Sequence, residues 1–298
     1  MQPSSPGLSR NPPSPKWLEG PHGRLAFFPY PAPDPWLHLL ISHGFSEHSG
    51  WWHHVAEAFC EQGISAYLFD HYHHGQSEGA PGDVGDFDIL TAGLAQVLRE
   101  GVAPFRGDDS RLVILGHSNG ALAALHGLAS PAPPEAAGLV LASPFLGMPR
   151  PVAFFHPLIM KLMSFINPRF AFPIPRRPHS LTANKEIWDH YDQDPLRFGH
   201  ITARFFMAMR RALQRVRSSK FSLPFPLLVL CSDEERVVSL DDIRHFFQRV
   251  GCEDKTLKEF IGFRHELFNE TRWEEVVSEV VRWAESRFRA SDSQKVPP

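Results

Sequence analysis

Two segments of the chain carry the pattern Gly-x-Ser-x-Gly, in which small residues flank a serine that can act as a nucleophile. They are GQSEG around Ser77 and GHSNG around Ser118. A nucleophilic serine of this kind needs a sharp turn between a strand and a helix, which leaves its Oγ exposed. The run RLVIL, typical of a strand, precedes Ser118 and the helical pattern ALAALHGLA follows it, whereas Ser77 lies between two loops. Glu78 beside Ser77 would also disfavour a developing oxyanion. We therefore predict Ser118 as the nucleophile.

A serine hydroxyl needs a general base, and the base needs a carboxylate that orients it. Where such a triad lies on a parallel sheet, the order along the chain is serine, acid and then histidine. Of the 17 histidines, His265 alone lies in the loop after the last predicted strand, KTLKEFIG. The position predicts His265 as the base.

Three carboxylates compete for the role of the acid in the run CSDEERVV, directly after the predicted strand LLVL. In many hydrolases the acid stands two residues before a Val-Val pair at this point. That register places Glu235 at the acid, with Asp233 as its rival. We expect Glu234 to face solvent.

Acyl transfer also needs two backbone N–H groups aimed at the developing oxyanion. One comes from the residue after the nucleophile, Asn119. The other follows an early buried strand, where this chain has HGFSEHSG. Gly44 allows the backbone to come close there, so we expect Phe45 to supply the second N–H.

Strands and helices must alternate along the chain to position these residues. Strands are predicted at residues 25–30, 37–42, 64–69, 111–115, 138–142, 227–230 and 256–261, and helices at 49–62, 87–103, 119–129, 240–250 and from 271 onward. This alternation is typical of a mostly parallel sheet with helices on both faces, so the predicted fold class is α/β.

The alternation stops in an insertion at about residues 145–215, and no strand is predicted between residues 145 and 200. Its run VAFFHPLIMKLMSFI, residues 152–166, indicates either a buried helical hairpin over the sheet or a cap that lines an acyl tunnel. In the second case Phe154, Phe155, Met160 and Met163 are expected to bind substrate.

The insertion also differs in charge from the rest of the chain. Residues 150–220 hold 13 Lys/Arg against 4 Asp/Glu, a net charge of +9, while the rest carries 17 against 29, or −12. A basic, apolar cap can contact an anionic membrane or a phosphate head group. The alternative is that the arginines only solvate a helix at residues 200–217.

Composition excludes several classes of protein. The hydrophobic fraction of 43% excludes disorder of the whole chain, and a net charge of −3 argues against a nucleic-acid partner. Three cysteines without paired spacing fit neither a disulfide framework nor a zinc cluster and indicate the cytosol. No apolar run reaches 18 residues. We expect a disordered leader at residues 1–17, a single domain at 18–298, and a cytoplasmic protein that can associate peripherally with the inner membrane face.

The motifs taken together resemble those of the monoacylglycerol lipase and bacterial lysophospholipase family. The resemblance covers residues 25–285 or so and rests on HGFSEHSG, DHYHHGQSEG, GHSNG, the DPL of the insertion and KTLKEFIGFRHELFNE. It implies an α/β-hydrolase fold with an inserted helical cap, hydrolysis of the acyl ester of a single-chain lipid, and no cofactor. The chain departs from the family at Trp51, where the lipases carry an Arg that holds the glycerol end, and at Asn119, where Met is more usual. Trp51 is accordingly expected at the substrate site.

Three other interpretations compete with a lipid esterase. The run DHYHH is similar to metal-binding His clusters, but no second ligand set accompanies it, so no metal is expected. The chain also resembles prolyl aminopeptidases at the level of the fold, which would make it an amide hydrolase. A hydrolase-fold binding protein without chemistry is disfavoured, because such proteins typically lose a triad residue and this chain keeps all three types.

Overall fold

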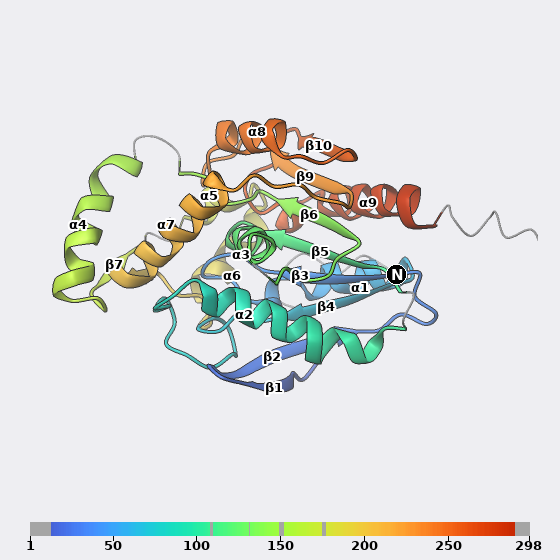
Figure 1. Cartoon of the computed structure of the whole chain (residues 1–298), viewed down its shortest axis with the longest axis horizontal. Helices are drawn as coiled ribbons and strands as arrows, with labels where there is room; N and C mark the ends of the chain where they lie inside the picture. The colour runs from blue at the N-terminus through green and yellow to red at the C-terminus, as the bar shows by residue number, and fades with distance from the viewer. Residues whose placement is uncertain (1–12, 108–109, 131, 149–151, 175–176, 290–298) are drawn as a thin grey trace, which may run out of the picture.

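Eight strands of the computed structural model form one sheet, in the order β1-β2-β4-β3-β5-β6-β9-β10 (Figure 1). The structure describes residues 13–107, 110–130, 132–148, 152–174 and 177–289, and only the backbone of residues 152–157. The strands are β1 (Lys16–Gly20), β2 (Gly23–Tyr30), β3 (Leu37–Ser42), β4 (Ile64–Phe69), β5 (Leu112–His117), β6 (Gly138–Ala142), β9 (Leu227–Ser232) and β10 (Lys255–Phe260).

The sheet is parallel from β4 to β10, and β2 pairs antiparallel with both β1 and β4. Every residue of β3, β4, β5, β6 and β9 is buried, as expected of strands covered on both faces. The carboxyl ends of the parallel strands meet at one edge, which is where open α/β sheets bind their ligands. The predicted fold class is confirmed.

Two hydrophobic clusters separate the helices into two layers. One cluster joins one face of the sheet to α2 (Asp88–Gln96), α3 (Asn119–Leu128) and α8 (Leu240–Arg249). The other joins the opposite face to α1 (His53–Glu61) and α9 (Trp273–Ala284). Short 3₁₀ and π-helical turns lie at η1 (Ser49–Trp51), η2 (Val97–Val102), η3 (Ala103–Phe105), η4 (Lys185–Ile187), η5 (Leu267–Asn269) and η6 (Glu285–Arg289).

The insertion between β6 and β9 builds a cap beside the carboxyl edge of the sheet (Figure 1). It contains α4 (Val152–Ile166), β7 (Ala171–Pro173), α5 (Pro178–Leu181), α6 (Trp188–Gln193), β8 (His200–Thr202) and α7 (Ala203–Ser218). The expectation of no strand between residues 145 and 200 is wrong, because β7 pairs antiparallel with β8. Each of these strands has only three residues, too few to show a period of two in the sequence.

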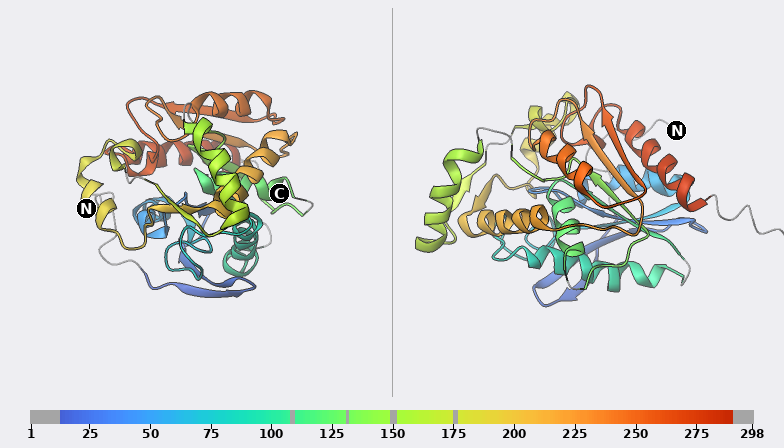
Figure 2. Two further views of the ribbon diagram at one scale, coloured as in Figure 1. Left: turned by 90° about the vertical axis from the view of Figure 1, so that its left-hand side faces the viewer. Right: turned by 45° about the horizontal axis from the view of Figure 1, so that its top comes forward.

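The apolar helix α4 is only half covered. Its backbone packs along α7, Met160 is buried and Met163 is partly buried against the main cluster. The opposite face is open to solvent, where five large apolar side chains are 53–77% exposed: Leu158, Ile159, Leu162, Phe165 and Ile166. Figure 2 shows α4 at the outer margin of the molecule. The hypothesis of a buried helical hairpin is therefore wrong for α4, whereas α7 buries one face in the core.

The N-terminal boundary also differs from the expectation. The predicted leader ends at residue 17, but β1 begins at Lys16 and pairs with β2; residues 1–12 lie outside the described part of the chain. No helix within the described residues is long and apolar enough to cross a bilayer.

Candidate active site

Ser118 stands on a sharp turn between β5 and α3. Its backbone has φ +50° and ψ −113°, a conformation that an L-residue rarely adopts. The two flanking glycines make the turn possible. A Cβ on Gly116 would lie 2.6 Å from the Cα of Ala121, and one on Gly120 would lie 2.1 Å from the carbonyl oxygen of Ser42. The strand, turn and helix therefore approach one another in a way that only small residues permit.

His265 and Glu235 complete a line of hydrogen bonds with this serine. The Oγ of Ser118 is 3.0 Å from Nε2 of His265, and Nδ1 of His265 is 2.9 Å from Oε2 of Glu235. Glu235 follows β9, and His265 follows β10. In this arrangement Ser118 can give its proton to His265, whose Nδ1–H donates to the carboxylate and so leaves Nε2 as the acceptor.

The environment keeps Glu235 ionised. Burial of its side chain raises the pKa of the carboxyl group, but His265 and the backbone N–H groups of Val237 and Val238 more than offset this. The net effect is a pKa below the ordinary value. An ionised acceptor is what stabilises the imidazolium that forms when His265 takes a proton.

The rival acids point elsewhere. The Oδ1 of Asp233 accepts a hydrogen bond from the backbone N–H of Gly262 at 2.7 Å, in the turn that follows β10. Glu234 is exposed and pairs with Arg236. Asp233 therefore holds a turn near the base and does not contact it.

Ser77, in the second Gly-x-Ser-x-Gly segment, has a structural role. Its Oγ donates to the carbonyl oxygen of Asp70 at 2.6 Å and accepts from the N–H of Ala26 at 2.9 Å. Both bonds are buried, so this hydroxyl is committed to joining β2 to the loop after β4.

The segment after β3 lies directly beside the nucleophile. A Cβ on Gly44 would be 3.4 Å from the Cβ of Ser118. The N–H groups of Phe45 and Asn119 have no protein acceptor within the described chain, so both are available to an oxyanion. The Phe45 ring packs edge-on against Phe198 of the cap, with the ring centroids 5.2 Å apart.

The residues expected to bind substrate are distributed differently. Trp51 is fully buried, stacks on Tyr191 at 4.2 Å between ring centroids and donates its indole N–H to Asp194. The nucleophile and the base are buried as well, so the expected contact of Trp51 with substrate stays a prediction. Met160 and Met163 face the core side of α4. The side chains of Phe154 and Phe155 lie outside the described residues.

A buried polar network beside the triad escaped the sequence analysis. Arg197 is 9% exposed and donates to Glu266, the residue after the base. Glu47 is 2% exposed and accepts from the N–H of Gly44 at 2.7 Å. In the sequence, this network is indicated only by the charge of Arg197 in the DPLR run of the insertion. The sequence does not show which carboxylates Arg197 contacts.

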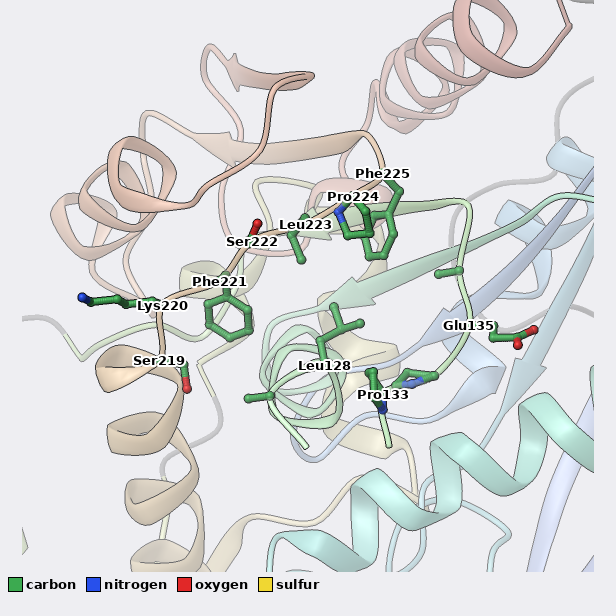
Figure 3. Close-up of a pocket in the computed structure, with 13 residues that line it drawn as sticks. Leu128, Pro133, Glu135, Ser219, Lys220, Phe221, Ser222, Leu223, Pro224 and Phe225 are labelled. Carbon is green, nitrogen blue, oxygen red and sulfur yellow. The ribbon is translucent and has the colours of Figure 1, made fainter. Parts of the chain in front are cut away.

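A cavity of about 680 Å³ lies away from these residues (Figure 3). It is lined by Leu128 at the end of α3, by the loop before β6 and by residues 219–225. Ser118 lies at the other end of α3, about 15 Å away along the helix axis at 1.5 Å per residue. Within the described residues no three His, Cys, Asp or Glu side chains are grouped as metal ligands.

Comparisons with known proteins agree with this geometry. The model of a family described as "Serine aminopeptidase, S33" matches residues 33–272. The monoglyceride lipase of Mus musculus is 30% identical over 280 residues, which cover 90% of this chain and 89% of that protein. The one of Homo sapiens is 29% identical over 301 residues, covering 97% of each.

A solved structure extends the likeness to three dimensions. The crystal structure of Paleococcus ferrophilus monoacylglycerol lipase matches with a TM-score of 0.78 and 25% identity, covering 88% of this chain and 98% of that one. The chain therefore belongs to the α/β-hydrolase family of the monoacylglycerol lipases and is an enzyme of the serine ester hydrolase class.

Proposed function

We propose that this enzyme cleaves the acyl ester of single-chain lipids, either monoacylglycerols or lysophospholipids, through an acyl-enzyme intermediate. One observation carries the proposal: the unbroken line from Ser118 Oγ through His265 to Glu235, with links of 3.0 and 2.9 Å. Ser118 is the nucleophile, His265 the general base and Glu235 the orienting acid.

The reaction has two halves. His265 takes the proton of Ser118 as Oγ attacks the ester carbonyl, and the N–H groups of Phe45 and Asn119 stabilise the oxyanion of the tetrahedral intermediate. The intermediate then breaks its bond to the alcohol, which leaves with the proton from His265. Water, deprotonated by the same imidazole, attacks the acyl-enzyme, and collapse of the second intermediate releases the fatty acid and restores the Ser118 hydroxyl.

The names of the relatives and the apolar side chains of the cap support this substrate class. The mouse and human relatives are named monoglyceride lipases. The ring of Phe45 continues into an apolar region of the cap that includes Phe198 and Phe205. Each CH₂ of an acyl chain buried on such a surface contributes about 0.8 kcal/mol, so a long chain gains more than acetate.

Peripheral contact with a membrane is part of the proposal. The exposed face of α4 presents Leu158, Leu162 and Phe165, and the cap that carries it is basic. Apolar side chains on a basic surface are the combination that binds an anionic lipid interface without spanning it. Such a contact on the inner membrane face would bring the cap to the layer in which single-chain lipids dissolve.

A fluorophosphonate probe combined with a substrate panel tests the proposal. The probe should label wild-type protein and leave Ser118→Ala unlabelled, whereas a binding protein without chemistry would not react. Long-chain monoacylglycerols and lysophospholipids should exceed p-nitrophenyl acetate and aminoacyl-proline amides in kcat/KM. Faster turnover of acetate would contradict an acyl site in the cap. Faster turnover of the proline amides would favour the aminopeptidase alternative that the family description suggests.

A further inference from the structure

Residues 194–198 of the insertion, called here the 194–198 segment, bind two loops of the site at once. Its Phe198 N–H donates to the Oγ of Ser46 at 3.1 Å, and that hydroxyl in turn donates to the carbonyl of Phe198. Ser46 is the residue after Phe45, the proposed oxyanion donor. The cap is therefore attached directly to residues 43–51, called here the oxyanion strip, which contain the proposed oxyanion donor.

Asp194 makes a second attachment to the same strip. Its carboxylate accepts from Nε2 of His48 at 2.8 Å and from the indole N–H of Trp51 at 2.7 Å. Burial raises the pKa of this carboxyl, but His48 and the other donors more than offset it and lower the pKa to about 2. Asp194 is thus ionised at every working pH and holds residues 48–51 by charge-assisted hydrogen bonds.

Arg197 reaches both halves of the machinery. Its guanidinium lies 4.2 Å from the centroid of the Tyr191 ring and donates to Oε1 of Glu266 at 3.3 Å. Glu266 follows His265 in the chain. The same guanidinium lies 5.4 Å from the centroid of the Trp51 ring, at the end of the oxyanion strip. Burial raises the pKa of Glu47, whose carboxylate accepts the N–H of Gly44, and the charge of Arg197 opposes that rise. One cation therefore acts on a carboxylate of the base loop and on a carboxylate of the oxyanion strip.

Burial disfavours the charged form of both carboxylates. Glu47 and Glu266 are 2% and 4% exposed, burial raises the pKa of both, and Glu47 raises the pKa of Glu266 further. A buried charge that loses its partner is costly and tends to be neutralised or to move. Removal of the guanidinium should therefore disturb the Glu47–Gly44 bond and the Glu266 loop together.

Resting on the proposed function, we propose that Arg197 is a positioning residue in the cap insertion. It keeps the oxyanion N–H of Phe45 correctly placed relative to the imidazole of His265. It touches neither substrate nor reacting atoms. It acts through Glu47 on one side and Glu266 on the other. Loss of this placement should lower kcat and leave KM nearly unchanged, because Arg197 itself is not one of the apolar side chains proposed to bind the acyl chain.

The chain offers a matched control for cap attachment. Arg204 of α7 pairs with Asp83 in the loop after β4, and the Thr202 hydroxyl donates to the same carboxylate at 2.9 Å. This pair also fastens the cap to the body, but it contacts neither the oxyanion strip nor the base loop. Arg204→Met removes an ion pair that attaches the cap, without altering the proposed placement of Phe45 and His265.

The experiment measures kcat, KM and Tm of Arg197→Met, Arg197→Lys, Arg204→Met and Ser118→Ala with a soluble p-nitrophenyl ester. Arg197→Met should lose about 100-fold in kcat, the loss typical of a shift of about 1 Å at a reacting centre, with KM within about twofold. Arg197→Lys, which keeps the charge, should recover part of the loss. Arg204→Met should lower Tm and keep kcat. Equal kcat values for folded Arg197→Met and Arg204→Met would overturn the proposal.

A double-mutant cycle covers the case in which Arg197→Met does not fold. Glu47→Gln keeps the shape and the acceptor oxygen but removes the charge, and it should itself lower kcat. If Arg197 acts through Glu47, the loss in the double variant with Arg197→Lys should be smaller than the product of the single losses. Multiplicative losses, or a normal kcat for Glu47→Gln, would overturn the proposal. The proposed function fails separately, if Ser118→Ala keeps its activity.

Discussion

At the residue scale, the backbone at Ser118 holds a conformation that costs an L-residue about 1–3 kcal/mol. The surroundings compensate by hydrogen bonding on both sides of the turn. The N–H of Ser118 donates to Ala142 in the next strand, and its carbonyl accepts from Leu122 and Phe145. The strained turn is therefore anchored to β6, to α3 and to the start of the insertion, and its Oγ remains directed at His265.

Ser118→Ala is expected to abolish ester hydrolysis, while Ser77→Ala keeps it. Removal of the nucleophile from such a triad lowers kcat by about 10⁴–10⁶. The Ser77 hydroxyl makes two buried hydrogen bonds, so its loss should destabilise the fold by about 1–3 kcal/mol at unchanged kcat. Initial rates and urea midpoints of the two variants distinguish these effects. Equal losses of activity in folded protein would reject Ser118 as the nucleophile.

Glu235→Gln is expected to lower kcat by about 10⁴. The N–H groups of Val237 and Val238 would hold the amide oxygen, so the NH₂ group would face Nδ1 of His265 and favour the wrong tautomer. Asp233→Asn is the matched control, since Asp233 accepts only from Gly262 and an amide oxygen can replace it. Steady-state kinetics at pH 8 measures both. A collapse in Asp233→Asn together with normal rates in Glu235→Gln would exchange their roles.

The triad candidates were accessible to sequence reasoning because each follows a recognisable strand. The turn around Ser118 has glycines on both sides, and Glu235 precedes the Val-Val pair at a fixed distance. The network of Arg197, Glu47 and Glu266 was not accessible, because its members are 150 and 69 residues apart and only the fold brings them together. For the same reason the sequence does not reveal that the indole of Trp51 donates to Asp194, which is 143 residues away.

At the scale of elements, strong local patterns predicted the observed bounds and weak ones did not. Residues 37–42 and 64–69 form β3 and β4 as expected, because both are mostly apolar runs of strand length. Strands β7 and β8 have three residues each, and β1 is an exposed edge strand with little apolar patterning. Pairing with a partner strand, which no single segment reveals, determines these three.

Helix α4 should carry the contact with membranes. Leu162→Ser and Phe165→Ser together remove two apolar side chains that are 58% and 77% exposed. Full burial of each would contribute about 1.5–3 kcal/mol, so binding to vesicles of phosphatidylcholine and phosphatidylserine should weaken by tenfold or more in sedimentation. Ile261→Ser, at a residue that is 68% exposed outside the cap, is the control and should leave binding intact. Unchanged binding of the α4 variant would assign the contact to another surface.

At the scale of the whole molecule, an unusual number of imidazoles is enclosed between the layers. Burial lowers the pKa of seven histidines by a large amount, in four of them to about 4 and in the other three well below the ordinary value of 6.5: His38, His53, His54, His74, His43, His71 and His117. These rings are neutral in the folded protein at neutral pH. The unfolded chain protonates them near pH 6.5.

The fold should therefore lose stability steeply in mild acid. Between pH 6.5 and 4 the unfolded state binds protons that the folded state does not, so the free energy of unfolding falls as the pH falls. Each such histidine contributes a slope of about 1.4 kcal/mol per pH unit. Urea titrations at pH 7.5, 6.5 and 5.5 should show little change above pH 7 and a sharp decline below 6.5. Equal midpoints at pH 7.5 and 5.5 would contradict the burial of neutral imidazoles.

The end of α7, the last helix of the insertion, lies beside the start of the insertion. There Nε of Arg217 donates to the carbonyl of Leu146 at 2.9 Å. The two ends of the insertion are thus adjacent, which favours its replacement by another insertion. A chimera can take the cap of another family member between these two points and keep the strand order of the host. The grafted cap must still supply an Asp and an Arg at positions 194 and 197. We expect a graft without them to bring the acyl preference of its donor but to lower turnover.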